Sequence, residues 1–397
     1  MPPAVEEGVP SAFLEEGGAS HKEYASDGTG LAATEKLVST GDPDYDKKMQ
    51  ELWGGPAPIY YGAALEKWPT EHVNGAGKTA LITGSSGGIG FYVARILARC
   101  GYTIIVPART GFEDDAAGAK AGILRETPGA TVIVPSMNLD LTSLASCRAF
   151  GKAICAEHKE LSVLCLNAGR GGAKDDKRGE TDGMENIMLT NVYGHLVLAA
   201  ELMPLLKATA GARVVTQSSG ARLLKGPGKL GDLEGTDSEN YNGFDQYCLS
   251  KASCVLMTQA LNDRLEKAGI DVTCLATDPG LTSTGVNIQH QLSHSLMDTA
   301  FSAAAENFNT TNAIHDAMGH HAADGALAMA LASVVASPKR NDFYTTTVLG
   351  DAPAPGAVLT DPEAAASDPL NAQMWPADAR EIFWGQAIKV TSADFGI

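Results

Sequence analysis

A glycine-rich turn between a buried strand and an amphipathic helix constrains this chain more than any other sequence feature. The apolar run 79–82 leads into Thr83-Gly84-Ser85-Ser86-Gly87-Gly88-Ile89-Gly90, and an amphipathic pattern follows over 89–100. Glycines at these spacings permit a sharp turn, close approach of the backbone to a diphosphate and tight packing of helix on strand. Because a helix N-terminus offers free N–H groups to phosphates, the turn predicts a dinucleotide site. The contacts expected from it are Gly84, Ser86, Gly88, Ile89 and Gly90.

Strand and helix patterns alternate along the region that follows the turn. The strands are continuous runs of Val, Ile and Leu, which are typical of a parallel sheet covered by helices on both faces. Right-handed crossovers then favour a single α/β domain with a doubly wound, Rossmann-type sheet. Further strands are expected at 103–106, 131–137, 161–167, 212–218, 271–277 and 344–349, and helices at 114–126, 142–158, 183–208, 244–268 and 321–336.

The domain expected over 78–350 is flanked by two segments of different composition. Residues 1–77 are rich in Gly, Pro, Ala and acidic residues, with aromatic residues between 50 and 70. We interpret them as an extension that wraps the domain or docks on a partner, with a disordered tail as the alternative. Residues 283–320 interrupt the alternation and are expected to form a substrate lid. The C-terminal tail, 351–397, ends in an aromatic cluster that could cover the core edge or a neighbouring subunit.

The charge and the apolar patterning limit the partners of the chain. A formal net charge of −17 argues against binding to nucleic acid or to anionic membranes, because both need a positive surface. We expect no transmembrane span. The N-terminus is acidic from Glu6 onward, so it resembles neither a secretory signal nor an Arg-rich transit peptide, and a transit peptide already removed would leave no trace.

The seven cysteines and nine histidines show no metal-binding spacing. The cysteines form no C-x-x-C pair, so we expect reduced, buried thiols in a reducing intracellular compartment, either the cytoplasm or a plastid or other organelle stroma. His290 and His294 are four residues apart, and His320 is adjacent to His321, but a zinc site needs more ligands in register. We therefore expect no metal.

The residues after the second strand bear on the choice of cofactor. That strand ends in Pro107-Ala108-Arg109-Thr110, at the edge that meets the adenosine ribose in this fold. An acidic residue there would accept hydrogen bonds from both ribose hydroxyls and favour NAD. Arg109 would instead pair with a 2′-phosphate and favours NADP (NADPH); the alternative is an ordinary surface arginine.

Two further strand ends offer cofactor contacts. Asp140, with the backbone of Leu141 beside it, could accept a hydrogen bond from the adenine amino group, could cap the helix expected from Thr142, or could do both. The fourth strand ends in Asn167-Ala168-Gly169, where small residues would let the backbone lie along the cofactor.

Four polar residues form a candidate catalytic group. Tyr247 and Lys251 are four residues apart on one helix face. A phenol titrates near ~10, so it serves as an acid–base group at neutral pH when a neighbouring ammonium stabilises its anion. Ser219 follows a strand end and could hydrogen-bond the substrate oxygen, while Asn191 could order a water for proton relay. A solvated Tyr–Lys pair and an ordinary hydrogen-bonded helix Asn are the alternatives.

These motifs, in this order, resemble the short-chain dehydrogenase/reductase family over residues 78–350. The turn 83–90 is similar to its TGxxxGxG motif, and 167–169 is similar to its NAG motif. The resemblance implies an Asn-Ser-Tyr-Lys tetrad and adds a PG motif after the sixth strand, followed by a Thr that meets the nicotinamide carboxamide. The residues that match are Asn191, Ser219, Tyr247 and Lys251 for the tetrad, and Pro279, Gly280 and Thr284 for the last motif.

A finer resemblance points to the retinol-dehydrogenase-like branch and to its relatives, the light-dependent protochlorophyllide reductases. Segments 139–144, 191–195 and 247–251 are similar to the first group, and 279–285 to the second. The resemblance implies an NADP-dependent oxidoreductase that acts on an apolar retinoid-, steroid-, carotenoid- or tetrapyrrole-like molecule. Light would be needed only for a protochlorophyllide-like substrate. Because the termini have no counterpart, the alternative is a dinucleotide-binding accessory or structural subunit, in a homo-oligomer or a larger assembly.

Overall fold

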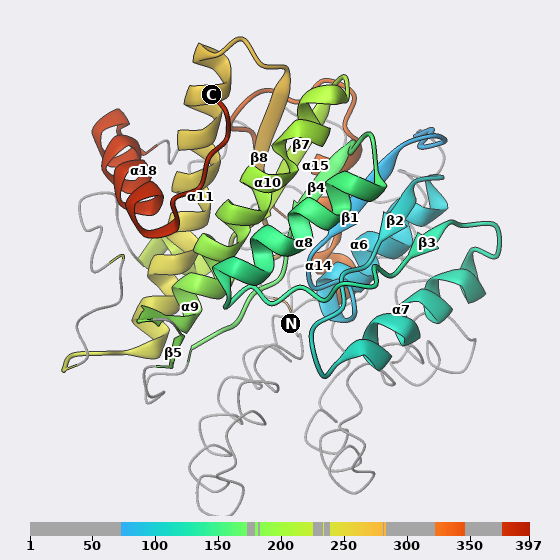
Figure 1. Cartoon of the computed structure of the whole chain (residues 1–397), viewed down its shortest axis with the longest axis horizontal. Coiled ribbons are helices and arrows are strands. Elements are labelled where there is room, and N and C mark those ends of the chain that lie inside the picture. Colours follow the sequence, from blue (N-terminus) through green and yellow to red (C-terminus); the bar gives the residue numbers. More distant parts are fainter. Residues whose placement is uncertain are drawn as a thin grey trace, which may run out of the picture.

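The structure is a computed structural model of the chain (Figure 1). It describes residues 73–172, 179–181, 183–224, 233, 239–280, 282, 322–345 and 375–397. The aromatic segment within 50–70 and the lid expected at 283–320 lie outside these residues, and so does Thr284. The predictions made for them stay predictions.

A seven-stranded parallel sheet forms the centre of the described chain, in the order β3-β2-β1-β4-β7-β8-β9. Leu81 of the first strand pairs with Ile105 on one side and with Leu164 on the other. The chain order reverses between β1 and β4, and open α/β sheets bind ligands at the carboxyl ends of the strands at such a reversal. The strands are β1 (Thr79–Ile82), β2 (Thr103–Ile105), β3 (Val132–Ile133), β4 (Val163–Leu166), β7 (Ala212–Gln217), β8 (Val272–Asp278) and β9 (Phe343–Thr345).

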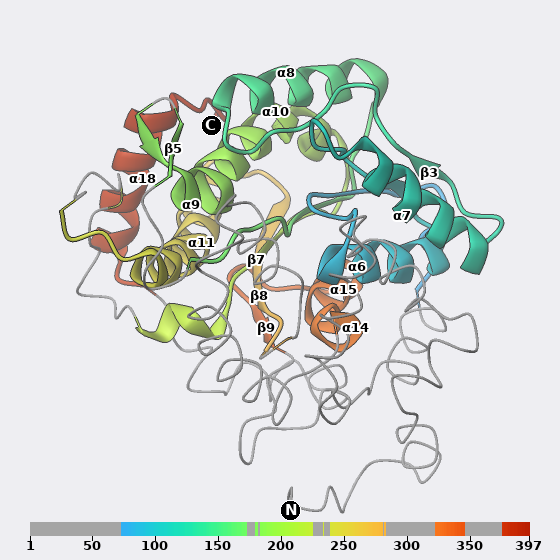
Figure 2. The same cartoon turned by 90° about the horizontal axis from the view of Figure 1, so that it is seen from below.

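Helices cover both faces of the sheet, which confirms the predicted doubly wound fold (Figure 2). Alternate strand residues face opposite layers: Leu81 joins the apolar cluster beneath α8, α10 and α11, whereas Ala80 and Ile82 join the cluster beneath α6, α7 and α15. Apolar residues on both faces explain why the strand patterns are continuous rather than alternating. These helices are α6 (Gly88–Arg99), α7 (Glu113–Glu126), α8 (Leu144–Glu157), α10 (Gly194–Ala208), α11 (Gly243–Lys267) and α15 (Leu327–Val334).

The edge strand β3 is shorter than the prediction of 131–137. It ends at Ile133, two residues before Pro135, which has no N–H to donate to a ladder and is therefore confined to edges and strand ends. The helix expected at 321–336 is also divided, into α14 (Ala322–Gly325) and α15, with Ala326 between them.

The helix predicted over 183–208 begins later and contains an irregular turn. A short hairpin, β5 (Glu180–Thr181) and β6 (Met184–Glu185), precedes α9 (Asn186–Met188). The Glu185 carboxylate caps α9 by accepting hydrogen bonds from the N–H groups of Ile187 and Met188, both at 2.8 Å. A π-helical turn, η1 (Leu189–Tyr193), then connects α9 to α10 and contains Asn191. Such a turn widens the hydrogen-bonding pattern and is frequent at functional sites.

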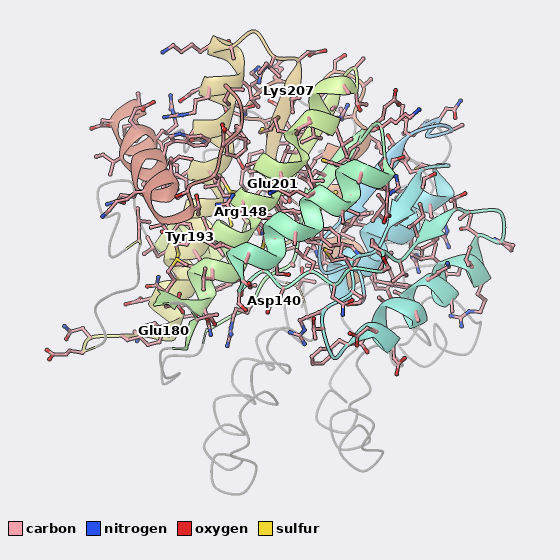
Figure 3. The ribbon with its side chains drawn as sticks, in the orientation of Figure 1. Asp140, Arg148, Glu180, Tyr193, Glu201 and Lys207 are labelled. Carbon is pink, nitrogen blue, oxygen red and sulfur yellow. The ribbon has the colours of Figure 1, made fainter. Side chains whose placement is uncertain are left out.

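By length and composition alone, the run Asn186–Ala208 is long and apolar enough to cross a membrane, so the prediction that no transmembrane span exists stays a prediction. In the described residues it is a core helix, because 83% of its most apolar window is buried. It packs on α8, where Arg148 and Glu201 form an ion pair at 3.2 Å and face each other between the two helices (Figure 3). Burial by the chain itself accounts for the apolar composition.

The tail carries a C-terminal helix, α18 (Ala377–Thr391), which packs lengthwise on α11 (Figure 1). Phe383 is fully buried in that contact, and the guanidinium of Arg380 lies 2.6 Å from the carboxylate of Asp263. Arg264 stacks over the Trp384 ring at 4.2 Å. The tail aromatics therefore cover the core edge of their own chain.

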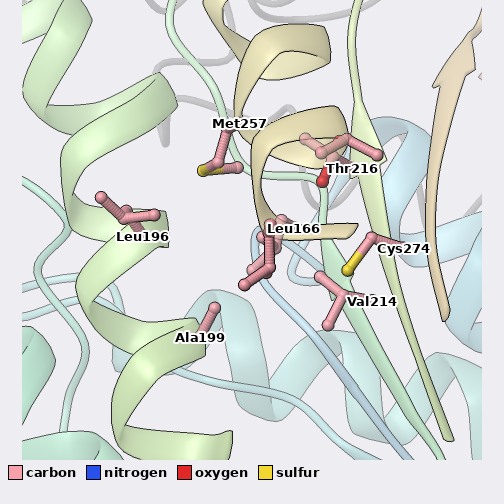
Figure 4. Close-up of a pocket in the computed structure, with 9 residues that line it drawn as sticks. Leu166, Leu196, Ala199, Val214, Thr216, Met257 and Cys274 are labelled. Carbon is pink, nitrogen blue, oxygen red and sulfur yellow. The ribbon is translucent and has the colours of Figure 1, made fainter. Parts of the chain in front are cut away.

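A small cavity lies in the core between α10, α11 and the strands β4, β7 and β8 (Figure 4). Its space of about 10 Å³ is roughly that of one water molecule. Apolar side chains dominate its lining, so we interpret it as a packing gap and not as a ligand site. The lining residues are Leu166, Leu196, Ala199, Val214, Thr216, Met257, Thr258, Leu261 and Cys274.

Candidate active site

The glycine-rich turn lies at the switch point of the sheet and requires its glycines. Gly84 and Gly88 have left-handed backbone angles, with φ of +66° and +52°. A Cβ on Gly90 would lie 2.4 Å from the carbonyl oxygen of Gly84, so a side chain there would push helix and strand apart. A Cβ on Gly88 would meet nothing within 4 Å, which leaves open space above the N-terminus of α6. Ser86 and Ile89 are half-buried on the same turn.

Thr83 joins this turn to the segment after β4. Its hydroxyl oxygen accepts hydrogen bonds from the backbone N–H groups of Asn167 and Ala168, both at 3.0 Å. The Asn167 amide returns a hydrogen bond of 2.9 Å to the Thr83 carbonyl. The predicted cofactor segments 83–90 and 167–169 are therefore held side by side.

His195 is a buried part of the site to which the sequence analysis gave no role. Its Nδ1 lies 3.2 Å from the carbonyl oxygen of Asn191, and its Nε2 lies 2.9 Å from the Thr83 hydroxyl. Because a carbonyl can only accept, Nδ1 carries the proton and Nε2 accepts from Thr83. Burial lowers the pKa of His195 to about 3, so the ring stays neutral. A lone histidine four residues after Asn191 in an apolar helix was the available signal.

The Asn191 side chain holds the loop after β4 against α11. Its Oδ1 accepts from the N–H of Arg170 at 2.8 Å, and its Nδ2 donates to the Arg170 carbonyl at 3.0 Å and to the Ser250 hydroxyl at 2.9 Å. Both amide hydrogens are thus used by the protein, and a relay water at Asn191 stays a prediction. A Cβ on Gly169 would lie 3.3 Å from Asn191 Oδ1 and from Lys251 Nζ, which shows how closely this segment approaches α11.

Tyr247 and Lys251 share one face of α11 at the carboxyl edge of the sheet. The Lys251 ammonium is buried and donates to the carbonyl oxygen of Gln217 at 3.1 Å. The same nitrogen lies 5.8 Å from the centre of the Tyr247 ring, and Tyr247 is half-buried. The Ser218 hydroxyl donates to the Lys251 carbonyl at 2.7 Å, so β7 and α11 are locked together.

Ser219 lies two residues after the end of β7 and is half-buried. Its hydroxyl oxygen accepts a hydrogen bond of 3.3 Å from the N–H of Ala221, so the hydroxyl hydrogen is not consumed by that bond. Two residues earlier, Gln217 contacts Lys251, which places Ser219 on the same edge as the Tyr–Lys pair. The structure thus brings together the tetrad segments that are far apart in the sequence.

The segment after β8 completes this edge. Gly280 has a φ of +69°, and its N–H donates to the Asp278 carboxylate at 2.9 Å. The Thr282 hydroxyl donates to the Pro279 carbonyl at 2.7 Å and so closes the turn.

Arg109 and Asp140 are the residues predicted to contact the adenosine part of the cofactor. Arg109 is exposed after β2, and its guanidinium lies 3.7 Å over the ring of Phe112. Asp140 accepts hydrogen bonds from the N–H of Thr142 at 2.9 Å and from its hydroxyl at 2.7 Å. The cap predicted for Asp140 is wrong, because α8 begins at Leu144 and Ser143 caps it. Leu141, next to Asp140, is buried.

The described residues hold no group of three or more His, Cys, Asp or Glu side chains that could bind a metal. The four histidines weighed for zinc in the sequence analysis lie outside those residues. All seven cysteines are free, and burial raises the pKa of Cys165 and Cys274 to about 12. Cys165 and Cys274 are therefore packing groups rather than nucleophiles.

Comparisons with known proteins agree with this geometry. A family model described as short chain dehydrogenase matches residues 78–230. Retinol dehydrogenase 12 from Bos taurus is 38% identical over 205 residues, which are 52% of this chain and 61% of that protein. Polyprenol dehydrogenase from Mus musculus is 33% identical over 213 residues, again 52% of this chain and 61% of that protein. The chain thus spans less than two thirds of the length of these relatives.

A crystal structure of an uncharacterized protein from Mycobacterium Paratuberculosis shares the fold over most of the chain. The match covers 82% of this chain and 98% of that one, with a TM-score of 0.55 and 26% sequence identity. Similarity to solved structures thus reaches beyond the segment 78–230 that the family model matches.

Proposed function

Because this chain belongs to the short-chain dehydrogenase/reductase family, in its retinol-dehydrogenase-like branch, we propose that it is an NADP-dependent oxidoreductase. The reaction is hydride transfer between the nicotinamide and a carbonyl or alcohol carbon, or a polarised double bond, of an apolar small molecule. The observation that carries the proposal is the buried Lys251 ammonium, 5.8 Å from the Tyr247 ring at the carboxyl edge of the sheet.

The residues at the carboxyl edge of the sheet fit a dinucleotide. A helix N-terminus without a side-chain cap, left-handed glycines and open space above Gly88 form a cradle that a side chain would fill. The turn 83–90 would hold the diphosphate, and 167–169 would lie along the cofactor. Pro279 and Gly280 would hold the nicotinamide end. The nicotinamide, when bound, supplies or accepts the hydride.

Arg109 supports NADP as the cofactor. Its guanidinium follows β2 at the ribose edge, where a 2′-phosphate would receive charge-assisted hydrogen bonds. The Phe112 ring beneath it restrains the guanidinium without neutralising it.

The tetrad residues divide the proton chemistry. Tyr247 donates a proton to the developing oxyanion during reduction and takes one from the alcohol during oxidation. The Lys251 ammonium would stabilise the phenolate and would hold the cofactor ribose. Ser219 donates its hydroxyl hydrogen to the same substrate oxygen. Asn191 keeps the loop after β4 and the helix α11 in register for these contacts.

An apolar substrate is supported by the surroundings of Tyr247. Phe244 lies three residues earlier on the same helix face and is 43% exposed, although most of α11 is buried. An exposed phenyl ring beside an acid–base group is a natural surface for an apolar chain. The relatives named for retinol and polyprenol suggest long isoprenoid alcohols or aldehydes as the first substrates to test.

The test is a turnover assay of the full chain with NADPH or NADH, and a panel of retinal, isoprenoid aldehydes, steroid ketones and tetrapyrroles, in the dark and in light. We expect oxidation of NADPH with an apolar aldehyde in the dark. Turnover restricted to a tetrapyrrole in light would move the substrate assignment to the protochlorophyllide-like class. Tight NADPH binding without turnover of any substrate would instead identify a cofactor-binding accessory subunit.

A further inference from the structure

A buried ion pair lies directly behind the predicted catalytic edge and joins two of its loops. Arg222 belongs to the short helix η2 (Gly220–Leu224), which follows Ser219, and Asp278 is the last residue of β8. The guanidinium Nη1 lies 2.5 Å from the Asp278 carboxylate. Both side chains are almost completely buried, with 4% and 3% of their surfaces exposed.

Arg222 also binds the backbone of Ser219, the residue proposed to contact the substrate oxygen. Its Nη1 also donates to the carbonyl oxygen of Ser219 at 2.9 Å, and its backbone N–H donates to the same oxygen at 3.0 Å. The guanidinium stacks over the ring of Phe343 at 4.2 Å, which anchors it to β9. The Ser219 backbone is thus tied to two neighbouring strands through one side chain.

Asp278 connects the same cation to the other loop. One carboxylate oxygen binds Arg222, and the other accepts the N–H of Gly280 at 2.9 Å. The single carboxylate therefore couples the Ser219 loop after β7 to the Pro279-Gly280 turn after β8. In the proposed function, the first loop holds the substrate oxygen and the second holds the nicotinamide end of the cofactor.

We propose that the Arg222–Asp278 pair is a positioning device, which sets the Ser219 hydroxyl relative to the Gly280 turn and thereby aligns the substrate oxygen. The inference rests on the proposed function, because it needs Ser219 to touch the substrate. A buried pair seldom adds net stability, since desolvation offsets the Coulomb attraction, but it restricts geometry when both partners also bind the backbone. Here Arg222 binds the Ser219 carbonyl and Asp278 binds the Gly280 N–H.

The test compares turnover and thermal stability of variants of the full chain with an established substrate at saturating NADPH. Ser219→Ala should lower kcat by roughly 10- to 100-fold. Arg222→Met keeps an apolar contact with the Phe343 ring and the backbone hydrogen bond to the Ser219 carbonyl, but removes the guanidinium bonds to that carbonyl and to Asp278. It should lower kcat by roughly 10-fold. The double variant Ser219→Ala with Arg222→Met should be no slower than Ser219→Ala alone, because Arg222 acts through Ser219.

Asp278→Asn tests the contact with Arg222 separately from the contact with the Gly280 N–H. The amide oxygen can still accept the Gly280 N–H, so the Kd for NADPH should change by less than about 2-fold while kcat falls as in Arg222→Met. If Arg222→Met does not fold, the variant with both Arg222→Met and Asp278→Asn removes both charges and carries the same comparison.

Arg340→Met is the matched control at the opposite end of β8. Arg340 donates to the carbonyl oxygens of Val272 and Ile270 at 2.7 and 2.6 Å, so its loss should lower stability and leave kcat unchanged. The inference would be overturned, with the proposed function left intact, if folded Arg222→Met had the wild-type kcat. The same holds if the losses of kcat from Ser219→Ala and Arg222→Met multiplied in the double variant. Wild-type kcat in Ser219→Ala would overturn the proposed role of Ser219 and the inference with it.

Discussion

His195 illustrates how one buried side chain connects two parts of the site. Through its two ring nitrogens it links the Thr83 hydroxyl, which supports the cofactor turn, to the Asn191 carbonyl in the π-helical turn. Both contacts require the neutral ring in one tautomer. A protonated ring would lose the acceptor to which Thr83 donates, at a buried position.

His195 should therefore make the protein sensitive to acid. Its pKa is 6.5 in an ordinary environment and about 3 in the fold, so below pH 6.5 the unfolded chain binds the proton that the folded chain does not. Stability consequently falls as the pH drops, by about 2 kcal/mol between pH 7 and pH 5 from this group. Urea unfolding at both pH values should show that His195→Gln reduces the difference. The same substitution at His158 is the control, and an equal reduction there would contradict the assignment.

Tyr247 is the proposed proton donor, and its hydroxyl can be removed without changing the ring. Tyr247→Phe removes the proposed proton donor, so kcat should fall by roughly 10²- to 10⁴-fold while the Kd for NADPH stays within about 2-fold. Stopped-flow turnover and fluorescence titration with NADPH measure the two quantities. The control is Tyr344→Phe, which removes a hydroxyl of β9 that donates to the Asp342 carboxylate. It should leave kcat and the Kd for NADPH unchanged. Full turnover by Tyr247→Phe would show that another group transfers the proton.

Arg109 decides between the two nicotinamide cofactors in our proposal. Replacing it with Asp substitutes repulsion for attraction at the 2′-phosphate, so the affinity for NADPH should fall by roughly 10- to 100-fold and NADH should become the preferred ligand. Isothermal titration with both cofactors checks this. Equal affinities in the unmodified protein would remove Arg109 from the site.

At the scale of elements, the C-terminal helix α18 acts as a cover for α11, the helix that carries Tyr247 and Lys251. Besides the side-chain packing, the Lys207 ammonium of α10 binds the carbonyl oxygens of Phe395 and Gly396 at 2.9 and 3.0 Å. Arg148 of α8 reaches the Thr391 carbonyl. Three helices therefore hold the end of the chain, and α18 supports α11 from the side opposite the sheet.

Phe383→Ala tests how strongly α18 is docked. Removing a fully buried phenyl ring should cost about 3–5 kcal/mol. If this loss exceeds the free energy that docks α18 on α11, the backbone amides of 377–391 should lose protection from hydrogen exchange before those of the sheet do. The neighbouring Ile382 is 54% exposed, so Ile382→Ala is the matched control and should change little. Equal effects of the two substitutions would mean that Phe383 does not anchor the helix.

At the scale of the whole molecule, the parallel sheet gathers distant segments at one edge. The cofactor turn, the segment after β4 and the loops after β7 and β8 meet there because every parallel strand ends on the same side. The net charge of −17 does not prevent an anionic ligand from binding at this edge, since a helix N-terminus and Arg109 act locally while distant charges are screened.

A ligand held by so many segments should stabilise the entire domain. NADPH at about 100 times its Kd should raise the free energy of unfolding by about 2.7 kcal/mol, which a thermal scan with and without cofactor would detect. Gly90→Ala should abolish the response, because its Cβ would lie 2.4 Å from the Gly84 carbonyl oxygen. Gly129→Ala meets nothing within 4 Å and should keep the response. An unchanged midpoint in the parent protein would argue against cofactor binding.

The sequence by itself determined the fold class and most elements of the sheet. Runs such as 79–82 and 212–217 are apolar without interruption because both faces are buried, and this pattern is local enough to read along the chain. The glycine turn was predictable for the same reason, since left-handed angles at Gly84 and Gly88 depend on the residue itself.

Tertiary structure alone decided which polar groups meet. The partners of His195, Asn191 and Arg222 lie 112, 59 and 56 positions away along the chain for their contacts with Thr83, Ser250 and Asp278. No periodicity records such pairings, because hydrogen bonds between distant segments depend on how the strands are ordered in the sheet. The docking of α18 on α11 was likewise left open between the chain's own core and a neighbouring subunit, since an apolar helix face shows that it will be buried but not by which surface.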